Sequence, residues 1–124
     1  MYPEDLKYHP EHCWARIEGN NATLGITYYA QDQLGEIVFL ELPAVGTEVV
    51  GKPYAEIESV KSVSDVYSPV NGTIVEVNQE VVEAPEIINE DCYEQGWMVK
   101  VELAEDSGVE ELLDAAAYEK LVSE

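Results

Sequence analysis

Short β-rich runs broken by turn residues follow one another along most of the chain, and this pattern restricts the fold more than any other feature. Most of the runs alternate apolar with polar residues, which is typical of strands that bury one face. Many short strands with turns between them predict a mainly β core built as a sandwich or a barrel. The runs are CWARIE and ATLGIT on either side of a hairpin turn at Gly19, Asn20 and Asn21, then EIVFLELP, PYAEIESV, SVSDVYSPV, TIVEVN and GWMVKVEL.

Three local patterns within these runs give specific predictions. In EIVFLELP, alternation puts Ile37 and Phe39 on one face of a strand. The dipeptide Asn71-Gly72 predicts a tight turn, because both residue types tolerate positive φ. In the last run, Trp97, Val99 and Val101 are expected to share one face.

Helices are predicted only at the edges of this β pattern. Thr27 is a suitable N-cap and Gly35 a suitable C-terminal residue for a short helix. One further helical turn is expected near Pro85. The tail changes period: Ser107 and Glu110 match a capping box at the start of an amphipathic C-terminal helix. Its apolar stripe would consist of Val109, Leu112, Leu113, Ala116 and Leu121.

Length and charge limit the classes of partner. A chain of 124 residues is expected to form one domain over residues 1–124. It has 26 Asp and Glu residues against 6 Lys and Arg residues, a formal net charge of −20. Such a charge repels nucleic-acid phosphates and anionic lipid headgroups, so we expect no nucleic acid and no membrane among its partners, whereas basic protein surfaces suit it. No signal peptide or membrane-spanning run is recognised, which favours a cytoplasmic protein.

The residues that usually carry chemistry form no familiar constellation. Cys13 and Cys92 lie far apart and belong to no Cys-x-x-Cys motif, so reduced thiols are expected and a disulfide between them stays an open alternative. The segment HPEHC, with His9 and His12, matches no standard zinc spacing, and no metal is predicted. There is no Gly-rich phosphate loop and no Ser-His-Asp arrangement. The sequence therefore favours a protein that is not itself an enzyme.

Lys61 is a candidate functional residue because of its place in the sequence. It is one of five lysines in the chain and lies between two strand-like runs, among small and β-branched neighbours. A turn at this place would expose its amine on a stiff support. The carboxylates of Glu58 and Asp65 would stabilise the charged amine, which disfavours a Schiff-base role. From the local pattern alone, an exposed lysine at a turn is usually only a solvated side chain. Among functional roles, an anchor for a covalently attached group fits better than a catalytic lysine.

The stretch ESVKSVSDVYSPVNGTIVEVN resembles the lipoylation hairpin of the glycine cleavage system H protein family. ATLGIT, LGEIVFLELP, INEDCYEQGWMVK and the final AAAYEKL resemble that family in order and spacing, over residues 8–121. The resemblance implies a flattened β-barrel, or barrel-sandwich hybrid of two sheets, with short peripheral helices and a closing helix. It implies lipoic acid in amide linkage on Lys61, with Glu58 and Asp65 around the attachment hairpin. Biotin carriers have methionine on both sides of their lysine, so biotin is disfavoured here.

What the resemblance implies is a carrier with a swinging arm. A lipoate ligase or lipoyl transferase would load Lys61, and the arm would shuttle a bound intermediate between several enzymes. In glycine cleavage these enzymes are glycine decarboxylase, aminomethyltransferase and dihydrolipoyl dehydrogenase. We expect the carrier itself to be a monomer.

One departure from the family pattern concerns the cargo. Cys13 stands where the family usually has the glutamate expected to hold the charged amine of the loaded arm, and Tyr28 and Gln33 also depart. This pattern is similar to H-like lipoate-binding proteins of heterodisulfide-reductase-like sulfur oxidation systems. Our main interpretation is therefore a sulfur carrier that works with such a complex, with Cys13 as a candidate contact to the loaded arm. Glycine cleavage is the first alternative, an unmodified acidic adaptor is the second, and Cys13 as a plain core residue stays open.

Overall fold

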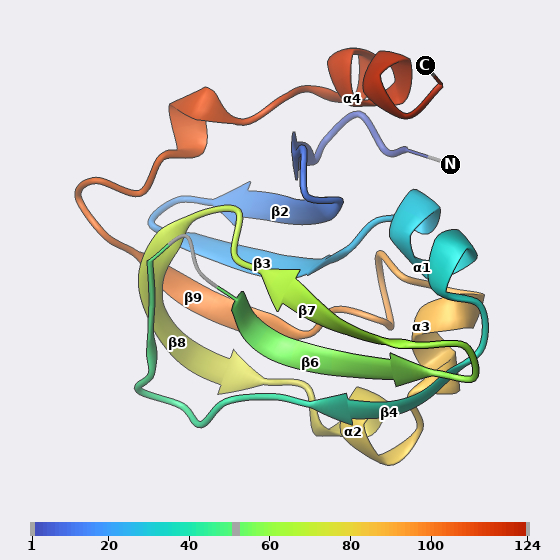
Figure 1. Cartoon of the computed structure of the whole chain (residues 1–124). Helices are drawn as coiled ribbons and strands as arrows, with labels where there is room; N and C mark the ends of the chain where they lie inside the picture. The colour runs from blue at the N-terminus through green and yellow to red at the C-terminus, as the bar shows by residue number, and fades with distance from the viewer. Residues whose placement is uncertain (1, 51–52, 124) are drawn as a thin grey trace.

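Two antiparallel sheets make up the core of the computed structural model, which describes residues 2–50 and 53–123. The six-stranded sheet has the order β1-β2-β3-β9-β8-β5, and the three-stranded sheet has the order β4-β6-β7. In Figure 1 the small sheet lies in front of the curled large sheet, which confirms the predicted barrel-sandwich hybrid. The strands are β1 (Lys7–His9), β2 (Cys13–Glu18), β3 (Asn21–Ile26), β4 (Ile37–Glu41), β5 (Glu48–Val50), β6 (Pro53–Ser59), β7 (Val63–Tyr67), β8 (Asn71–Val77) and β9 (Val99–Leu103).

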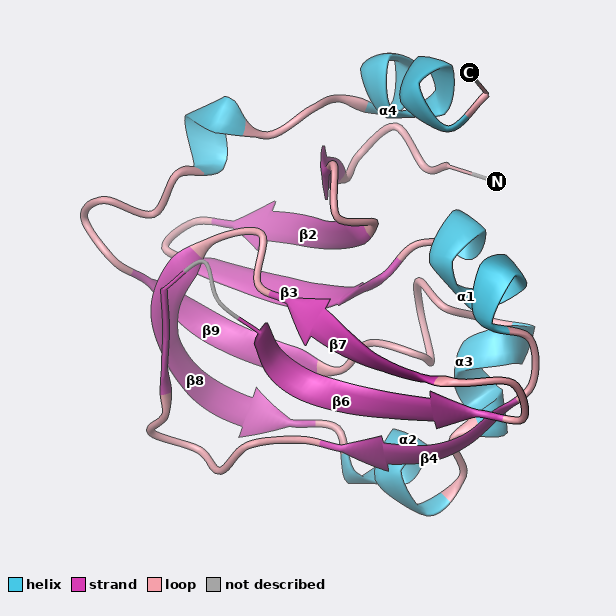
Figure 2. Cartoon of the chain, in the orientation of Figure 1, coloured by secondary structure: helices cyan, strands magenta, loops and turns pink. Residues whose placement is uncertain are grey.

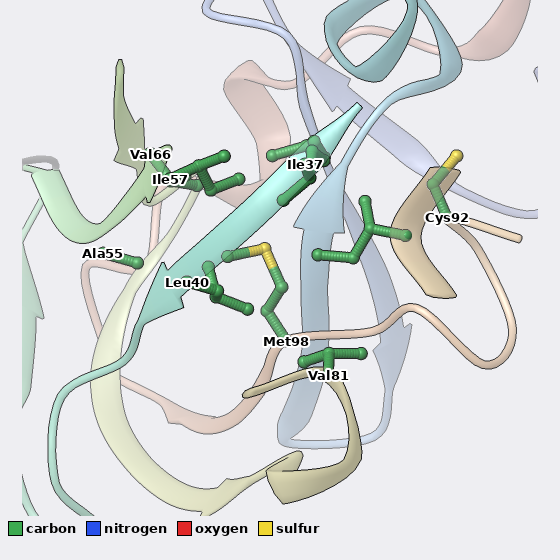
Figure 3. Packing of buried hydrophobic residues seen from close by; sticks show 10 residues of the cluster. Ile37, Leu40, Ala55, Ile57, Val66, Val81, Cys92 and Met98 are labelled. Atoms are coloured by element: carbon green, nitrogen blue, oxygen red, sulfur yellow. The ribbon is translucent and has the colours of Figure 1, made fainter. Parts of the chain in front are cut away.

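Buried side chains fill the space between the sheets in two clusters that share neighbours. The first cluster joins the small sheet to the helical end of the molecule, and Figure 3 shows its Met98 between Leu40 of β4 and Val81. The second cluster lies within the curl of the large sheet. Leu42 and Tyr54 pack against both clusters, so one apolar interior connects the two sheets. Burial of this interior is the main stabilising term for the fold.

The helices are peripheral, as Figure 2 shows and as expected. The predicted helix after Thr27 is confirmed: the Thr27 hydroxyl accepts from the amide of Ala30 at 3.2 Å, and the helix ends at Gly35 with φ 79°. The helical turn near Pro85 is also confirmed, and a further short helix precedes it. The bounds are α1 (Tyr28–Leu34), α2 (Gln79–Glu83), α3 (Glu86–Glu90), a 3₁₀ turn (Val109–Glu111) and α4 (Ala115–Val122).

The tail folds differently from the prediction. Ser107 and Glu110 do not cap an α-helix, because Gly108 leads into an isolated 3₁₀ turn. Leu113 is instead extended and exchanges two backbone hydrogen bonds with Tyr8, each of 2.8 Å. The helix α4 starts only at Asp114, whose carboxylate accepts from Ala117 at 2.8 Å. The backbone of Leu113 pairs with β1 although the apolar spacing of this segment predicts a helix.

The buried face of α4 is therefore not the predicted stripe. Ala115 and Tyr118 are its buried residues, whereas Ala116 is exposed and Leu121 is 41% exposed. Leu6, Tyr8 and Trp14 complete the small cluster that α4 covers. The helix thus packs on the outer side of the large sheet, close to the N-terminal segment, as Figure 1 shows.

The predicted turn at Asn71-Gly72 is wrong. Both residues lie inside β8, where Asn71 pairs with Val50 and Gly72 pairs with Val49 and Leu103. A Cβ atom on residue 72 would collide with the backbone carbonyl of Glu102. Glycine is needed here for the close approach of two strands, and not for a turn.

Two predictions about strand faces also need correction. In β4 the buried residues are Ile37 and Leu40, while Phe39 is 46% exposed, because a bulge between Ile37 and Phe39 shifts the alternation. Val99 and Val101 share the buried face of β9 as predicted, but Trp97 precedes the strand. The hairpin between β2 and β3 turns at Gly19 and Asn20 as expected. Among the described residues, no helix is both long and apolar enough to cross a membrane.

Replacing Gly72 by alanine should lower the free energy of unfolding by about 2–3 kcal/mol, since the added methyl group forces β8 and β9 apart. Urea unfolding followed by tryptophan fluorescence measures this change. Gly19→Asn is the matched control: position 19 has open space around it and a positive φ that asparagine tolerates. Equal stability of Gly72→Ala and wild type would contradict the close approach.

Candidate functional site

Lys61 occupies the exposed tip of the β6–β7 hairpin, where the sequence predicted it. The last strand pair is Glu58 with Val63, and the turn is closed by a 2.8 Å hydrogen bond from the Ser59 amide to the Ser62 carbonyl. The Ser59 hydroxyl oxygen also accepts from the amides of Lys61 and Ser62, at 3.2 Å each. These bonds fix the backbone of the tip while its amine faces water. The tip therefore combines a rigid support with an accessible nitrogen.

The tip is fastened to the turn between α1 and β4. The amide of Val60 donates to the carbonyl of Glu36 at 3.0 Å. The Lys61 stem lies over Gly35, since a Cβ atom built on residue 35 would be 3.0 Å from Lys61 Cε and 3.7 Å from Nζ. Glycine at position 35 thus serves two needs: it permits φ 79° and it leaves room for the lysine.

Asn89 of α3 holds that turn in place, a role that sequence reasoning missed. Its side-chain amide donates to the Gly35 carbonyl at 2.8 Å and to Gln31 Oε1 at 3.0 Å. Its side-chain oxygen accepts from the Ile37 amide at 2.9 Å. Asn89 therefore satisfies the backbone on both sides of the turn that supports the lysine. The only sequence signal was an asparagine in a helical turn otherwise flanked by apolar and acidic residues.

The two carboxylates predicted around the hairpin take different places. Glu58 is half-buried and lies opposite Phe39 and Val63 in the small sheet. Asp65 is exposed and lines a pocket beside the hairpin. The ion pairs found between described residues are Arg16–Glu94 and Lys100–Glu76, so neither Glu58 nor Asp65 is ion-paired with Lys61.

A pocket of about 200 Å³ separates the hairpin from α1 and from the start of β2. Its wall is apolar for the larger part, and the polar side chains in it are those of Glu11, His12, Gln33, Ser64 and Asp65. The hairpin that borders this pocket also carries Lys61, and Gly35, directly after α1, lies against the lysine stem. The lining residues are Glu11, His12, Cys13, Ile26, Tyr29, Ala30, Gln33, Leu34, Ile57, Ser64, Asp65 and Val66.

Cys13 lines this pocket, but its thiol is poorly suited to chemistry. The residue has no exposed surface, and burial, aided by the Glu11 carboxylate, raises the pKa of the thiol well above its ordinary value. Burial also raises the pKa of the Cys92 thiol, to about 12. Both cysteines are free. Two neutral thiols are weak nucleophiles, because the thiolate is the reactive form.

His12 contributes a strained backbone to the pocket wall. Its φ is 67°, the one positive φ found among the described residues other than glycine. Burial lowers the pKa of the imidazole, and the smaller effect of the nearby Glu11 carboxylate opposes this change. Burial therefore favours the neutral form of the His12 imidazole. In the described part of the chain no three His, Cys, Asp or Glu side chains gather in a way that could hold a metal ion.

Comparison with known proteins identifies the family. The family model described as glycine cleavage H-protein matches residues 6–124. The chain belongs to the glycine cleavage H-protein family. H proteins are lipoyl carriers, with lipoic acid attached covalently to a lysine, and are not enzymes themselves.

Individual H proteins resemble this chain over nearly its full length. The glycine cleavage system H protein of Carboxydothermus hydrogenoformans is 51% identical and covers 100% of this chain and 96% of its own. That of Bacillus subtilis is 48% identical, with 98% and 97% covered. The crystal structure of the H protein of Mycobacterium marinum superposes with a TM-score of 0.90 at 37% identity, over 98% of this chain and 99% of that chain.

These relatives overturn the sulfur-oxidation interpretation, since proteins about 50% identical over the whole length carry the name of the glycine cleavage system. The pocket shows the physical error in that interpretation. That interpretation assumes that Cys13 in place of a glutamate leaves the charged amine without a carboxylate. Glu11 and Asp65 nevertheless line the same pocket, so negative charge is still available there.

The burial of both thiols leads to a test of their reactivity. In the folded protein, Cys13 and Cys92 should react with Ellman's reagent at about pH 8 about a hundredfold more slowly than in the urea-unfolded chain. Ser123→Cys provides the control, because position 123 is exposed and should react at once. Rapid reaction of either native thiol in the folded protein would be inconsistent with the burial described above.

Proposed function

We propose that this chain is the H protein of a glycine cleavage system, lipoylated on Lys61. In that role it accepts an aminomethyl group from a pyridoxal-phosphate-dependent glycine decarboxylase and delivers it to a folate-dependent aminomethyltransferase. A dihydrolipoyl dehydrogenase then restores the arm. The observation that carries the proposal is the exposed Lys61 amine on a rigid hairpin tip, next to a largely apolar pocket with two carboxylates.

The residues around Lys61 fit a lipoyl group. When bound, this group supplies a dithiol that can hold and release a fragment by exchange. The chain provides an accessible amine for the amide bond, room over Gly35 for the lysine stem, and apolar side chains at the pocket. Leu34, Ile57 and Val66 would exclude water from whatever the arm carries into the pocket.

Glu11 and Asp65 have a distinct part in this proposal. Each carboxylate would attract the positive charge of an amine held in the pocket. Cys13 would contact the loaded arm only as a neutral, apolar part of the wall, because burial keeps its thiol protonated. Glu58, on the small sheet below the tip, would contribute to recognition by the lipoate ligase or lipoyl transferase that loads Lys61.

The charge of the chain also supports work with several partners. A net charge of −20 speeds encounter with enzymes that present basic surfaces around their active sites. Tethering the arm at the tip raises its local concentration at each docked enzyme. We place this cycle in the cytoplasm.

Lys61→Arg should abolish lipoylation while preserving the fold, because arginine keeps the charge but lacks a primary amine. Intact mass and peptide mapping after incubation with a lipoate ligase, lipoate and ATP measure the modification. Lys100→Arg is the matched control and should gain one lipoyl group, as wild type does. Unmodified wild-type Lys61 under conditions that load a known H protein would contradict the proposal.

The second step of the test is reconstitution. The lipoylated protein should support glycine-dependent reduction of NAD by glycine decarboxylase, aminomethyltransferase, dihydrolipoyl dehydrogenase and tetrahydrofolate, and Lys61→Arg should not. If the protein is lipoylated but inactive in this assay, its assignment to glycine cleavage is wrong.

Glu11→Gln should shorten the lifetime of the aminomethyl-loaded arm by about two- to fivefold, because one partly solvated carboxylate no longer attracts the amine. The measurement is the release of formaldehyde and ammonia from purified loaded protein. Cys13→Ser, also at the pocket wall, should change this lifetime far less, since the native thiol is neutral. A larger effect of Cys13→Ser than of Glu11→Gln would reverse the roles assigned to these residues.

A further inference from the structure

The strained His12 is held by a closed loop of hydrogen bonds that reaches the C-terminal helix. The Tyr118 hydroxyl of α4 lies 2.8 Å from His12 Nδ1 and 2.8 Å from Thr27 Oγ1. The Thr27 hydroxyl lies 3.4 Å from the His12 carbonyl, and the Thr27 amide donates to that same carbonyl at 3.2 Å. The side chain of His12 is therefore hydrogen-bonded to Tyr118, its backbone carbonyl is hydrogen-bonded to Thr27, and Thr27 and Tyr118 close the loop.

Two arrangements of protons satisfy the loop. In one, the Thr27 hydroxyl donates to the His12 carbonyl, Tyr118 donates to Thr27, and the Tyr118 oxygen accepts from His12 Nδ1. In the other, Thr27 donates to Tyr118, and Tyr118 donates to His12 Nδ1. In both, the Tyr118 hydroxyl is hydrogen-bonded to His12 Nδ1, so its loss changes the surroundings of that nitrogen. His9 lies outside the loop, and its Nδ1 accepts from the Glu11 amide at 3.0 Å.

This loop sets the shape of the pocket at its most strained point. Residues 9–12 form a tight turn in which the His12 amide donates to the His9 carbonyl at 2.9 Å. The positive φ of His12 directs the chain from this turn into β2, so it fixes where Glu11 and Cys13 meet the pocket. A left-handed conformation in a residue other than glycine persists only where its surroundings enforce it. Here the enforcing contacts come from Thr27 and Tyr118.

We propose that Tyr118 is a positioning residue, which holds His12 in its left-handed conformation and thereby makes α4 a structural part of the pocket that receives the arm. Its partners lie 106 and 91 residues away along the chain. The effect on the arm rests on the function proposed above. The effect on His12 and on the pocket wall does not.

The surroundings of Tyr118 allow its hydroxyl to be removed without disturbing its ring. The ring stacks on Tyr8 at 4.9 Å and meets Tyr2 edge-on at 5.3 Å, contacts that phenylalanine retains. Tyr118→Phe therefore deletes the two hydrogen bonds and keeps the packing. Tyr2→Phe removes a hydroxyl from the same aromatic group outside the loop and is the matched control.

The first measurement uses the unmodified protein and nitrogen-15 NMR of its two histidines. Tyr118→Phe should change the nitrogen-15 shifts of the His12 ring and leave the His9 signals unchanged, because only His12 loses a hydrogen bond to Nδ1. Tyr2→Phe should change neither. A role of Tyr118 in packing alone would lower stability without changing the His12 nitrogen shifts. An unchanged His12 in Tyr118→Phe overturns the proposal.

The second measurement tests whether the pocket wall changes when the Tyr118 hydroxyl is removed. In Tyr118→Phe, the rate of Cys13 alkylation by iodoacetamide, followed by peptide mapping, should rise about two- to tenfold, with Cys92 unchanged as the internal reference. On the lipoylated and loaded protein, aminomethyl release should accelerate by a similar factor, while the rate of Lys61 lipoylation stays at the wild-type value. Equal rates in Tyr118→Phe and wild type for Cys13 overturn the positioning role. If Cys13 alkylation accelerates but the release rate is unchanged, Tyr118 positions the pocket wall, and the proposal that the arm enters this pocket is wrong.

Discussion

The position of Lys61 depends on one contact, the docking of the β6–β7 hairpin on the turn between α1 and β4. The Val60–Glu36 hydrogen bond joins the two segments, and the absence of a side chain at Gly35 lets the lysine stem lie between them. Asn89 then binds the turn to α3. β6 itself pairs with β4 as far as Ser59, so this contact adds a fixed place for the turn that lies beyond the last strand pairs.

Sequence reasoning succeeded where the signal was local. Thr27 and Gly35 delimit α1 because capping needs only neighbouring residues, and Gly19 with Asn20 turns a hairpin for the same reason. Asn71-Gly72 had an equally strong local signal and failed. Its backbone pairs with β5, which comes earlier in the chain, and with β9, which comes later. Sheet pairing outweighs the local preference for a turn.

The site was predictable only in part, for a similar reason. The place of Lys61 at a hairpin tip could be predicted, because it belongs to one continuous stretch that resembles a known hairpin. The pocket is assembled from four separated segments, and no local pattern shows that Glu11 faces the same space as Asp65. The error about the cargo followed from judging Cys13 by its own position. The left-handed turn at His12, which brings Glu11 to the wall, depends on a tyrosine at the other end of the chain.

The burial of both cysteines has a consequence for a protein whose cofactor is itself a dithiol. A lipoyl arm alternates between an open pair of thiols and a closed ring, and any accessible thiolate on its own support would compete with the intended acceptor. Cys13 and Cys92 are both buried, and burial raises the pKa of both thiols, which disfavours the reactive thiolate. The two cysteine thiols therefore do not exchange with the lipoyl dithiol. Only the partner enzymes change the redox state of the arm.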